Sequence, residues 1–97
     1  QPDVVEFLEY ILLQKTMDVT LEEIPCSHLA RQFNGKPLGE LKSSDKSGTN
    51  IIGLKLSGAR YLFNPTPETV ISRNDLLFVL GTPQQVKIFR EAMEKEI

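Results

Sequence analysis

The strongest constraint on the fold is a run of consecutive apolar residues, Leu76–Leu80, near the end of the chain. A strand with one wet face alternates apolar and polar side chains, so this run predicts a central strand with both faces covered. Gly81 ends the run, and a helix is expected directly after it. Thr82 is the expected N-cap, Gln85 is its capping-box partner, and Pro83 is the first helical residue, where a missing N–H costs nothing.

The remaining segments predict a small domain of mixed helices and strands. Residues 19–25 form an expected strand whose apolar alternation slips once, which predicts a bulge. Residues 49–56 form a second strand, and a tight turn at Gly58 leads into a returning strand at residues 60–63. Leu38 and Leu41 give one apolar face to a short helical turn. The helix after Thr82 has an apolar stripe made of Val86, Phe89, Met93 and Ile97.

Alternation in the strand at residues 49–56 places Ile52, Leu54 and Leu56 together on the core face. Ile51 and Gly53 then point the other way. If these two residues are exposed, they form a small apolar patch suited to dimer packing or to a flat ligand held between two chains. Burial of both faces is the alternative, and the sequence leaves the two readings open.

The first helix is apolar around most of its circumference. One stripe contains Val4, Phe7 and Ile11, and a second contains Val5, Leu8, Leu12 and Leu13. A helix this apolar is not a free surface helix. We expect one side to pack on its own domain and the other on a part of the protein outside this sequence or on a second copy. The alternative is a terminal helix packed only on its own sheet.

The order of these elements predicts an α+β fold, a two-layer sandwich. The expected topology is β-X-β-β-β-α with a mixed sheet, preceded by an N-terminal connecting helix. We divide the chain into the connecting helix at residues 1–16 and the domain proper at residues 17–97. A chain of 97 residues allows one domain with a single core.

Composition and motifs argue against several functions. The net charge of −2 and the scattered Lys and Arg residues give no footprint for nucleic acid. No apolar run is long enough to span a bilayer. Cys26 and His28, each alone of its kind, are too few for a zinc site, so Cys26 is expected in the core or a loop and His28 at the surface. No phosphate-binding glycine motif or catalytic constellation is present, so the chain is not expected to be an enzyme.

Several separated motifs resemble the RCK C-lobe, the TrkA-C domain, in the correct order. PDVVEFLE resembles the helix that leads into the C-lobe from a nucleotide-binding N-lobe, and LEEI resembles the first strand. GKPLGEL and TNIIGLK are similar to the next two motifs of the family. NPTPETVISRNDLLFVLGTPQQVKIF is similar to its ending. The resemblance covers nearly the whole chain.

The resemblance implies a cytoplasmic regulatory domain attached to a potassium channel or transporter at the inner membrane of a prokaryotic cell. Its partners would be a second copy of itself, the N-lobe and the membrane protein, with no nucleic acid. Some members bind cyclic di-AMP at the dimer interface, through positions that correspond to Ile51, Ile52, Asn64 and Pro65. Arg60 is a candidate cation for a phosphate of that ligand. The alternative is a purely structural dimerisation domain that senses no ligand.

Overall fold

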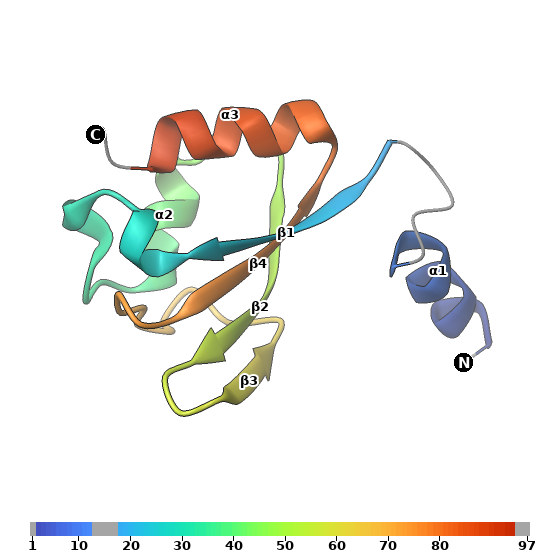
Figure 1. Cartoon of the computed structure of the whole chain (residues 1–97), viewed down its shortest axis with the longest axis horizontal. Helices are drawn as coiled ribbons and strands as arrows, with labels where there is room; N and C mark the ends of the chain where they lie inside the picture. Colours follow the sequence, from blue (N-terminus) through green and yellow to red (C-terminus); the bar gives the residue numbers. More distant parts are fainter. Residues whose placement is uncertain (1, 13–17, 95–97) are drawn as a thin grey trace.

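The computed structural model describes residues 2–12 and 18–94 and contains a four-stranded sheet with helices (Figure 1). The helices are α1 (Pro2–Leu12), α2 (Leu38–Ser44) and α3 (Pro83–Met93), with two short 3-10 helices, η1 (Cys26–His28) and η2 (Arg31–Phe33). The strands are β1 (Thr20–Pro25), β2 (Asn50–Leu56), β3 (Arg60–Phe63) and β4 (Leu76–Gly81). The α+β class is therefore as predicted.

The strand order in the sheet is β1-β4-β2-β3, and every neighbouring pair is antiparallel. The prediction of a mixed sheet is therefore wrong. A mixed sheet would need a parallel pair of neighbours, and β1 and β2 do run in the same direction. However, β4 lies between them and runs opposite to both, so the parallel strands never meet. The last strand in sequence is thus central in the sheet, as its apolar composition predicts.

The core lies between one face of the sheet and the helices, and α3 crosses that face in Figure 1. Leu77 and Val79 of β4 are fully buried there, against Phe89 of α3. The alternate residues of β4, Leu76 and Phe78, lie on the opposite face and are only half-buried. The sequence predicts cover on both faces of this strand, whereas the single chain covers one.

A β-bulge in β2 changes which of its residues enter the core. The register against β4 shifts between Ile51 and Gly53. Because a shift of one residue exchanges the two faces of a strand, Ile51 is buried together with Leu54, while Ile52 is half-exposed. The predicted faces are therefore wrong for Ile51 and Ile52, and Ile51 is not part of an exposed patch, whereas Leu54 and Leu56 lie toward the core as predicted. The bulge predicted for residues 19–25 is absent, since β1 pairs with β4 in continuous register from Thr20 to Pro25.

Local signals for the hairpin and for α3 are confirmed. The turn between β2 and β3 has a positive φ at Gly58, and at the next residue, Ala59. The side chain of Thr82 accepts a hydrogen bond from the N–H of Gln85, whose side chain accepts one from the N–H of Thr82. Of the predicted apolar stripe of α3, Val86, Phe89 and Met93 are buried, and Ile97 lies outside the described residues.

Helix α1 stands beside the body of the domain rather than on its sheet (Figure 1). All side chains from residue 3 to residue 10 are exposed, the apolar ones included. The exposed apolar residues are Val4, Val5, Phe7, Leu8 and Tyr10. In the single chain this helix therefore does not pack on its own sheet. None of the helices in residues 2–12 and 18–94 has the length and apolar character that crossing a membrane requires.

Candidate ligand groove beside the open sheet face

The face of the sheet turned away from α3 carries a set of aromatic and aliphatic side chains that no helix covers. We call it the open face and define it by Tyr61, Phe63, Leu76, Phe78 and Leu80. The rings of Tyr61 and Phe78 stack with centroids 6.3 Å apart. Phe63 is 80% exposed, which is unusual for a side chain of this size in a sheet. A contiguous apolar surface of this kind is typical of an interface.

A groove of about 360 Å³ adjoins the open face where β3 ends and β2 begins. Its lining comes from the end of α2, the loop before β2, the bulged start of β2, and β4. The lining residues are Lys42, Asp45, Gly48, Thr49, Asn50, Ile51, Ile52, Asn64 and Leu80. We call it the Ile52 groove. Leu80 belongs to both the groove and the open face, so the two surfaces are continuous.

The bulge in β2 and the turn after β3 position the centre of the groove. The N–H of Asn64 donates to the carbonyl oxygen of Ile52 over 2.8 Å. Asn64 has φ +55°, in the left-handed region that Asn tolerates better than most residues. This backbone turn leaves the Asn64 side chain exposed beside the half-exposed Ile52. An aliphatic surface and an amide that can donate and accept hydrogen bonds therefore lie together.

The loop before β2 is held by its own side chains. One carboxylate oxygen of Asp45 accepts from the N–H of Ser47 at 2.8 Å, and the other accepts from the hydroxyl of Thr49 at 3.2 Å. The hydroxyls of Ser47 and Thr49 are 2.9 Å apart, and Ser47 is buried. Because Asp45 is engaged by these donors, Lys42 is the cation of the groove whose ammonium is available to an anion. It has no ion-pair partner among the described residues.

The structure brings together three of the five residues that the resemblance suggests as ligand contacts. Ile51, Ile52 and Asn64 all line the groove. Pro65 is buried next to Asn64 and does not line it, and Arg60 begins β3 at the opposite end of the strand. At about 3.3 Å per residue, the four positions from Arg60 to Asn64 span about 13 Å. Lys42 was missed by sequence reasoning, because no motif links α2 to the hairpin.

Chemistry elsewhere in the described residues is sparse. Cys26 is buried, and burial, with a smaller contribution from the negative charge of Asp75, raises the pKa of its thiol to about 12. The thiol is therefore neutral and a poor nucleophile near neutral pH. His28 is at the surface, as predicted, with Nδ1 3.7 Å from a carboxylate oxygen of Glu94. Residues 2–12 and 18–94 contain no group of three or more His, Cys, Asp or Glu side chains that could hold a metal ion.

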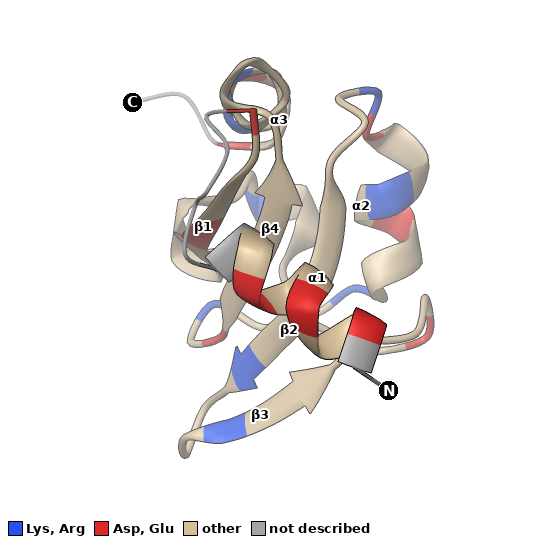
Figure 2. Ribbon diagram, turned by 90° about the vertical axis from the view of Figure 1, so that its right-hand side faces the viewer, with Lys and Arg blue, Asp and Glu red and all other residues tan. Residues whose placement is uncertain are grey.

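The Lys and Arg residues of the described parts of the chain do not form a cluster. Figure 2 shows Lys and Arg on the hairpin, on α2 and on the loops, separated from one another, and Asp and Glu along one side of α1. A nucleic-acid interface requires clustered cations. Together, the fold and the groove define a small binding domain with an uncovered sheet face.

The sequence identifies the family. Residues 32–94 match the TrkA-C domain, so the chain belongs to the TrkA-C domain family, the C-lobe of RCK domains. This is a non-enzymatic regulatory family associated with potassium channels and transporters. A curated relative, potassium channel protein 1 of Methanocaldococcus jannaschii, is 26% identical over 93 residues, which is 96% of this chain. The chain spans about a quarter (27%) of the length of that relative.

Solved structures share the fold. The GsuK channel bound to NAD aligns over 94% of this chain and 16% of its own, with 24% identity and a TM-score of 0.69. The RCK C domain of the potassium transport protein KtrA, in complex with cyclic di-AMP, aligns over 91% of this chain and 96% of its own, with 19% identity and a TM-score of 0.68. The RCK_C domain dimer of S. agalactiae BusR, also in complex with cyclic di-AMP, aligns over 77% and 90%, with 24% identity and a TM-score of 0.63.

Proposed function

We propose that this chain is the ligand-sensing C-lobe of a regulatory assembly that controls potassium transport by a channel or transporter on the cytoplasmic side of a prokaryotic membrane. It acts as a homodimer and binds cyclic di-AMP between its two copies. Residues 1–16 connect it to an N-lobe, and residues 17–97 form the regulatory domain. The proposal extends what the family is associated with to a specific ligand and a specific site.

The observation that carries the proposal is the continuity between the open face and the Ile52 groove. Leu80 lines both surfaces, so a second copy that covers Phe63 and Phe78 also closes the groove from above. A groove that is shallow in one chain then becomes a site with two walls. Cyclic di-AMP has two equivalent halves, and a site formed by two copies of one chain has matching symmetry.

The lining suits the chemistry of that ligand. Adenine is flat and apolar on its faces, and the half-exposed aliphatic side chain of Ile52 offers a surface for stacking. The amide of Asn64 can pair with a polar edge of the base, since it has both donors and an acceptor. Lys42 supplies a positive charge for the phosphodiester. Arg60 lies at the other end of its strand, too far along it for this role.

The regulatory step follows from binding between subunits. A ligand that binds one arrangement of the dimer better than another shifts the population toward that arrangement. The shift is as large as the difference between the two affinities, and no larger. The N-lobes and the membrane protein attached to the dimer would respond to the new geometry. A scaffold that only dimerises would show the association without the ligand response.

Thermal unfolding with cyclic di-AMP, combined with sedimentation, tests the proposal. At a hundredfold excess over Kd, ligand binding adds about 2.7 kcal/mol to the free energy of unfolding, which raises Tm by several degrees in a domain of this size. Lys42→Gln and Ile52→Ala should reduce the shift. Lys46→Gln is the matched control, because Lys46 is exposed and lies outside the groove lining. A stable dimer with no shift would support the structural alternative, and a monomer at high concentration would contradict both functions.

A further inference from the structure

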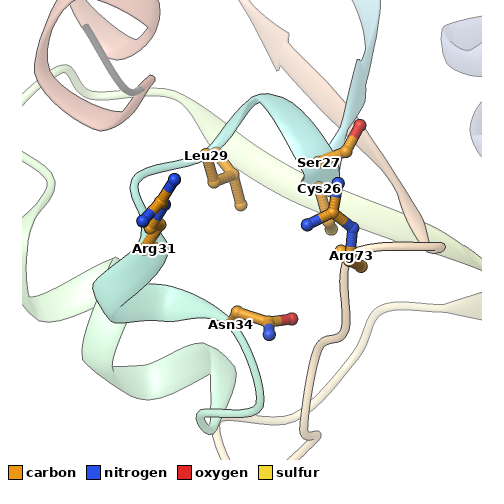
Figure 3. A pocket seen from close by; sticks show the side chains of 6 residues that line it. All are labelled: Cys26, Ser27, Leu29, Arg31, Asn34 and Arg73. Carbon is orange, nitrogen blue, oxygen red and sulfur yellow. The ribbon is translucent and has the colours of Figure 1, made fainter.

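A second cavity of about 360 Å³, separate from the Ile52 groove, lies between the two 3-10 helices and the turn that precedes β4. Its lining residues are Cys26, Ser27, Leu29, Arg31, Asn34 and Arg73. We call it the arginine pocket. In Figure 3 the side chains of Arg31 and Arg73 stand on opposite sides of it, and Leu29 points into the space between them. The pocket shares no lining residue with the groove.

Backbone hydrogen bonds close this pocket at both ends. The N–H of Cys26 donates to the carbonyl oxygen of Asp75 at 2.8 Å, and the N–H of Gly35 donates to that of Ile71, also at 2.8 Å. Segments 26–35 and 71–75 are therefore tied together at two points and separate between them. Further bonds shape each segment, including Leu29 to Cys26 at 3.1 Å and Asp75 to Ser72 at 3.0 Å. The cavity is thus built into the backbone path, which pre-organises its walls.

The two arginines of the pocket lack carboxylate partners within the described parts of the chain. Arg90, in contrast, is engaged by Glu22 at 3.1 Å and by Glu94 at 3.0 Å. Arg31 and Arg73 come from segments about forty residues apart in sequence, and the fold still directs both to one cavity. Like charges placed together without a counter-ion repel each other. An anion between them removes that repulsion.

The nearest acidic groups do not supply that anion. The carboxylate of Asp75 is buried and accepts hydrogen bonds from the N–H of Ser57, at 3.1 Å, and from the N–H of Ser72, at 2.9 Å. The hydroxyl of Ser72 donates to it as well, at 3.3 Å. Cys26 remains a neutral thiol because burial disfavours its thiolate. The charge of the pocket is therefore set by the two guanidinium groups.

The rest of the lining provides shape and hydrogen bonds. Leu29 and Cys26 are buried and form an apolar floor. Ser27 and Asn34 add a hydroxyl and an amide at the rim. The volume falls within the range of about 300–1,000 Å³ typical of small-molecule sites. A bare ion would leave most of this space unfilled.

We propose that the arginine pocket binds a small phosphorylated molecule, with its phosphate between Arg31 and Arg73 and its organic part on Leu29 and Cys26. A phosphate monoester suits this lining, because the N–H donors of each guanidinium form a fork that can bind two oxygens of one phosphate group. Ser27 and Asn34 supply hydrogen bonds to the remaining oxygens or to a hydroxyl of the ligand. The site shares no lining residue with the Ile52 groove or with the open face. The domain would then have a second ligand-binding site, formed by residues of a single chain.

Amide chemical shifts of the chain, titrated with inorganic phosphate and with glycerol 3-phosphate, test the proposal. Glycerol is the uncharged match, and succinate distinguishes a carboxylate from a phosphate. We expect saturable shifts at residues 26–35 and 71–75 below about 10 mM glycerol 3-phosphate at fixed ionic strength. Arg31→Gln and Arg73→Gln should each weaken binding about tenfold or more. Arg60→Gln is the control, because it removes the same charge outside the pocket.

Each alternative outcome contradicts the proposal. Unperturbed spectra at the highest phosphate concentration mean that no site is present. An equal loss of affinity in Arg60→Gln means diffuse attraction to positive charge rather than a pocket. Tighter binding of succinate than of glycerol 3-phosphate means a carboxylate site. Failure of cyclic di-AMP to bind leaves these shifts unaffected, so the two proposals are tested separately.

Discussion

Asn64 and Ile52 are joined by a backbone hydrogen bond of 2.8 Å, from the N–H of Asn64 to the carbonyl oxygen of Ile52, at the point where β3 ends and β2 bulges. The bulge moves Ile51 into the core and leaves Ile52 half-exposed. The positive φ of Asn64 turns the chain away from the sheet. These two irregularities together shape the groove, which regular pairing would have closed.

The left-handed conformation of Asn64 predicts an asymmetric response to mutation. Asn64→Ala should lower the free energy of unfolding by about 1 kcal/mol, because alanine tolerates this region less well than asparagine. Asn64→Gly should change the free energy of unfolding by only a few tenths of a kcal/mol, since glycine adopts the left-handed conformation freely. Urea denaturation measures both. Both variants should lose affinity for cyclic di-AMP, because both lack the amide. Equal destabilisation by glycine and alanine would contradict the backbone argument.

The exposure of Phe63 predicts that the proposed dimer depends on the open face. Phe63→Lys should convert the dimer to a monomer in sedimentation experiments, because it places a charge within an apolar interface. The unfolding free energy of the monomer should change little, since the side chain is 80% exposed in the single chain. Ile88→Lys, on α3, is the control for adding a charge at an exposed apolar position. A Phe63→Lys variant that remains dimeric would place the interface elsewhere.

The capping box of α3 predicts a measurable loss of stability. Thr82→Ala removes the acceptor for the N–H of Gln85 and should lower the free energy of unfolding by about 1 kcal/mol. Thr82→Ser retains a hydroxyl at the same position and should restore most of it. Urea denaturation of the three proteins makes the comparison. The prediction fails if serine and alanine are equally destabilising, because the hydroxyl would then contribute nothing.

The buried thiol of Cys26 predicts that stability falls in alkaline solution. Its pKa is raised from 9.0 to about 12 in the folded state, so above pH 9 the unfolded chain loses this proton first. The unfolded state then binds fewer protons than the native state, and the free energy of unfolding decreases as pH rises, by up to about 1.4 kcal/mol per pH unit. Well below pH 9 the thiol is protonated in both the folded and the unfolded state, so it does not contribute to the pH dependence of stability.

Denaturation of the wild type and of Cys26→Ala at several pH values measures this contribution. The variant is less stable at every pH because it loses buried volume. Its stability should nevertheless decline less steeply above pH 9, and the difference in slope between the two proteins isolates the contribution of the thiol. Parallel profiles for the two proteins would show that Cys26 does not carry the effect.

Local signals in the sequence predicted local structure well. The apolar run at residues 76–80 is a central strand, and Thr82, Pro83 and Gln85 begin the last helix as expected. These features depend on neighbours within a few residues, so composition and spacing are sufficient to recognise them. The positive φ of Gly58 in the hairpin turn belongs to the same group.

The candidate sites were predicted less completely. The family resemblance pointed to Ile51, Ile52 and Asn64, which do meet in one groove. It could not indicate Lys42, which reaches the groove from α2. Likewise, nothing near Arg31 in the sequence indicates Arg73, because the two segments meet through backbone hydrogen bonds between distant residues, among them those of Cys26 and Gly35. Contacts between distant segments depend on the whole chain path rather than on a local pattern.

The sequence by itself determined the elements, the central position of β4 and the family. The tertiary structure decided the register of β2, because a bulge exchanges the two faces of a strand without changing its composition. It also decided that every pair of neighbouring strands is antiparallel. Strand β4 lies between β1 and β2, which run in the same direction, and so keeps them from pairing. Finally, it left the open face uncovered in the single chain, because α2 and α3 both pack into the core on the other face and α1 stands beside the domain with its side chains exposed.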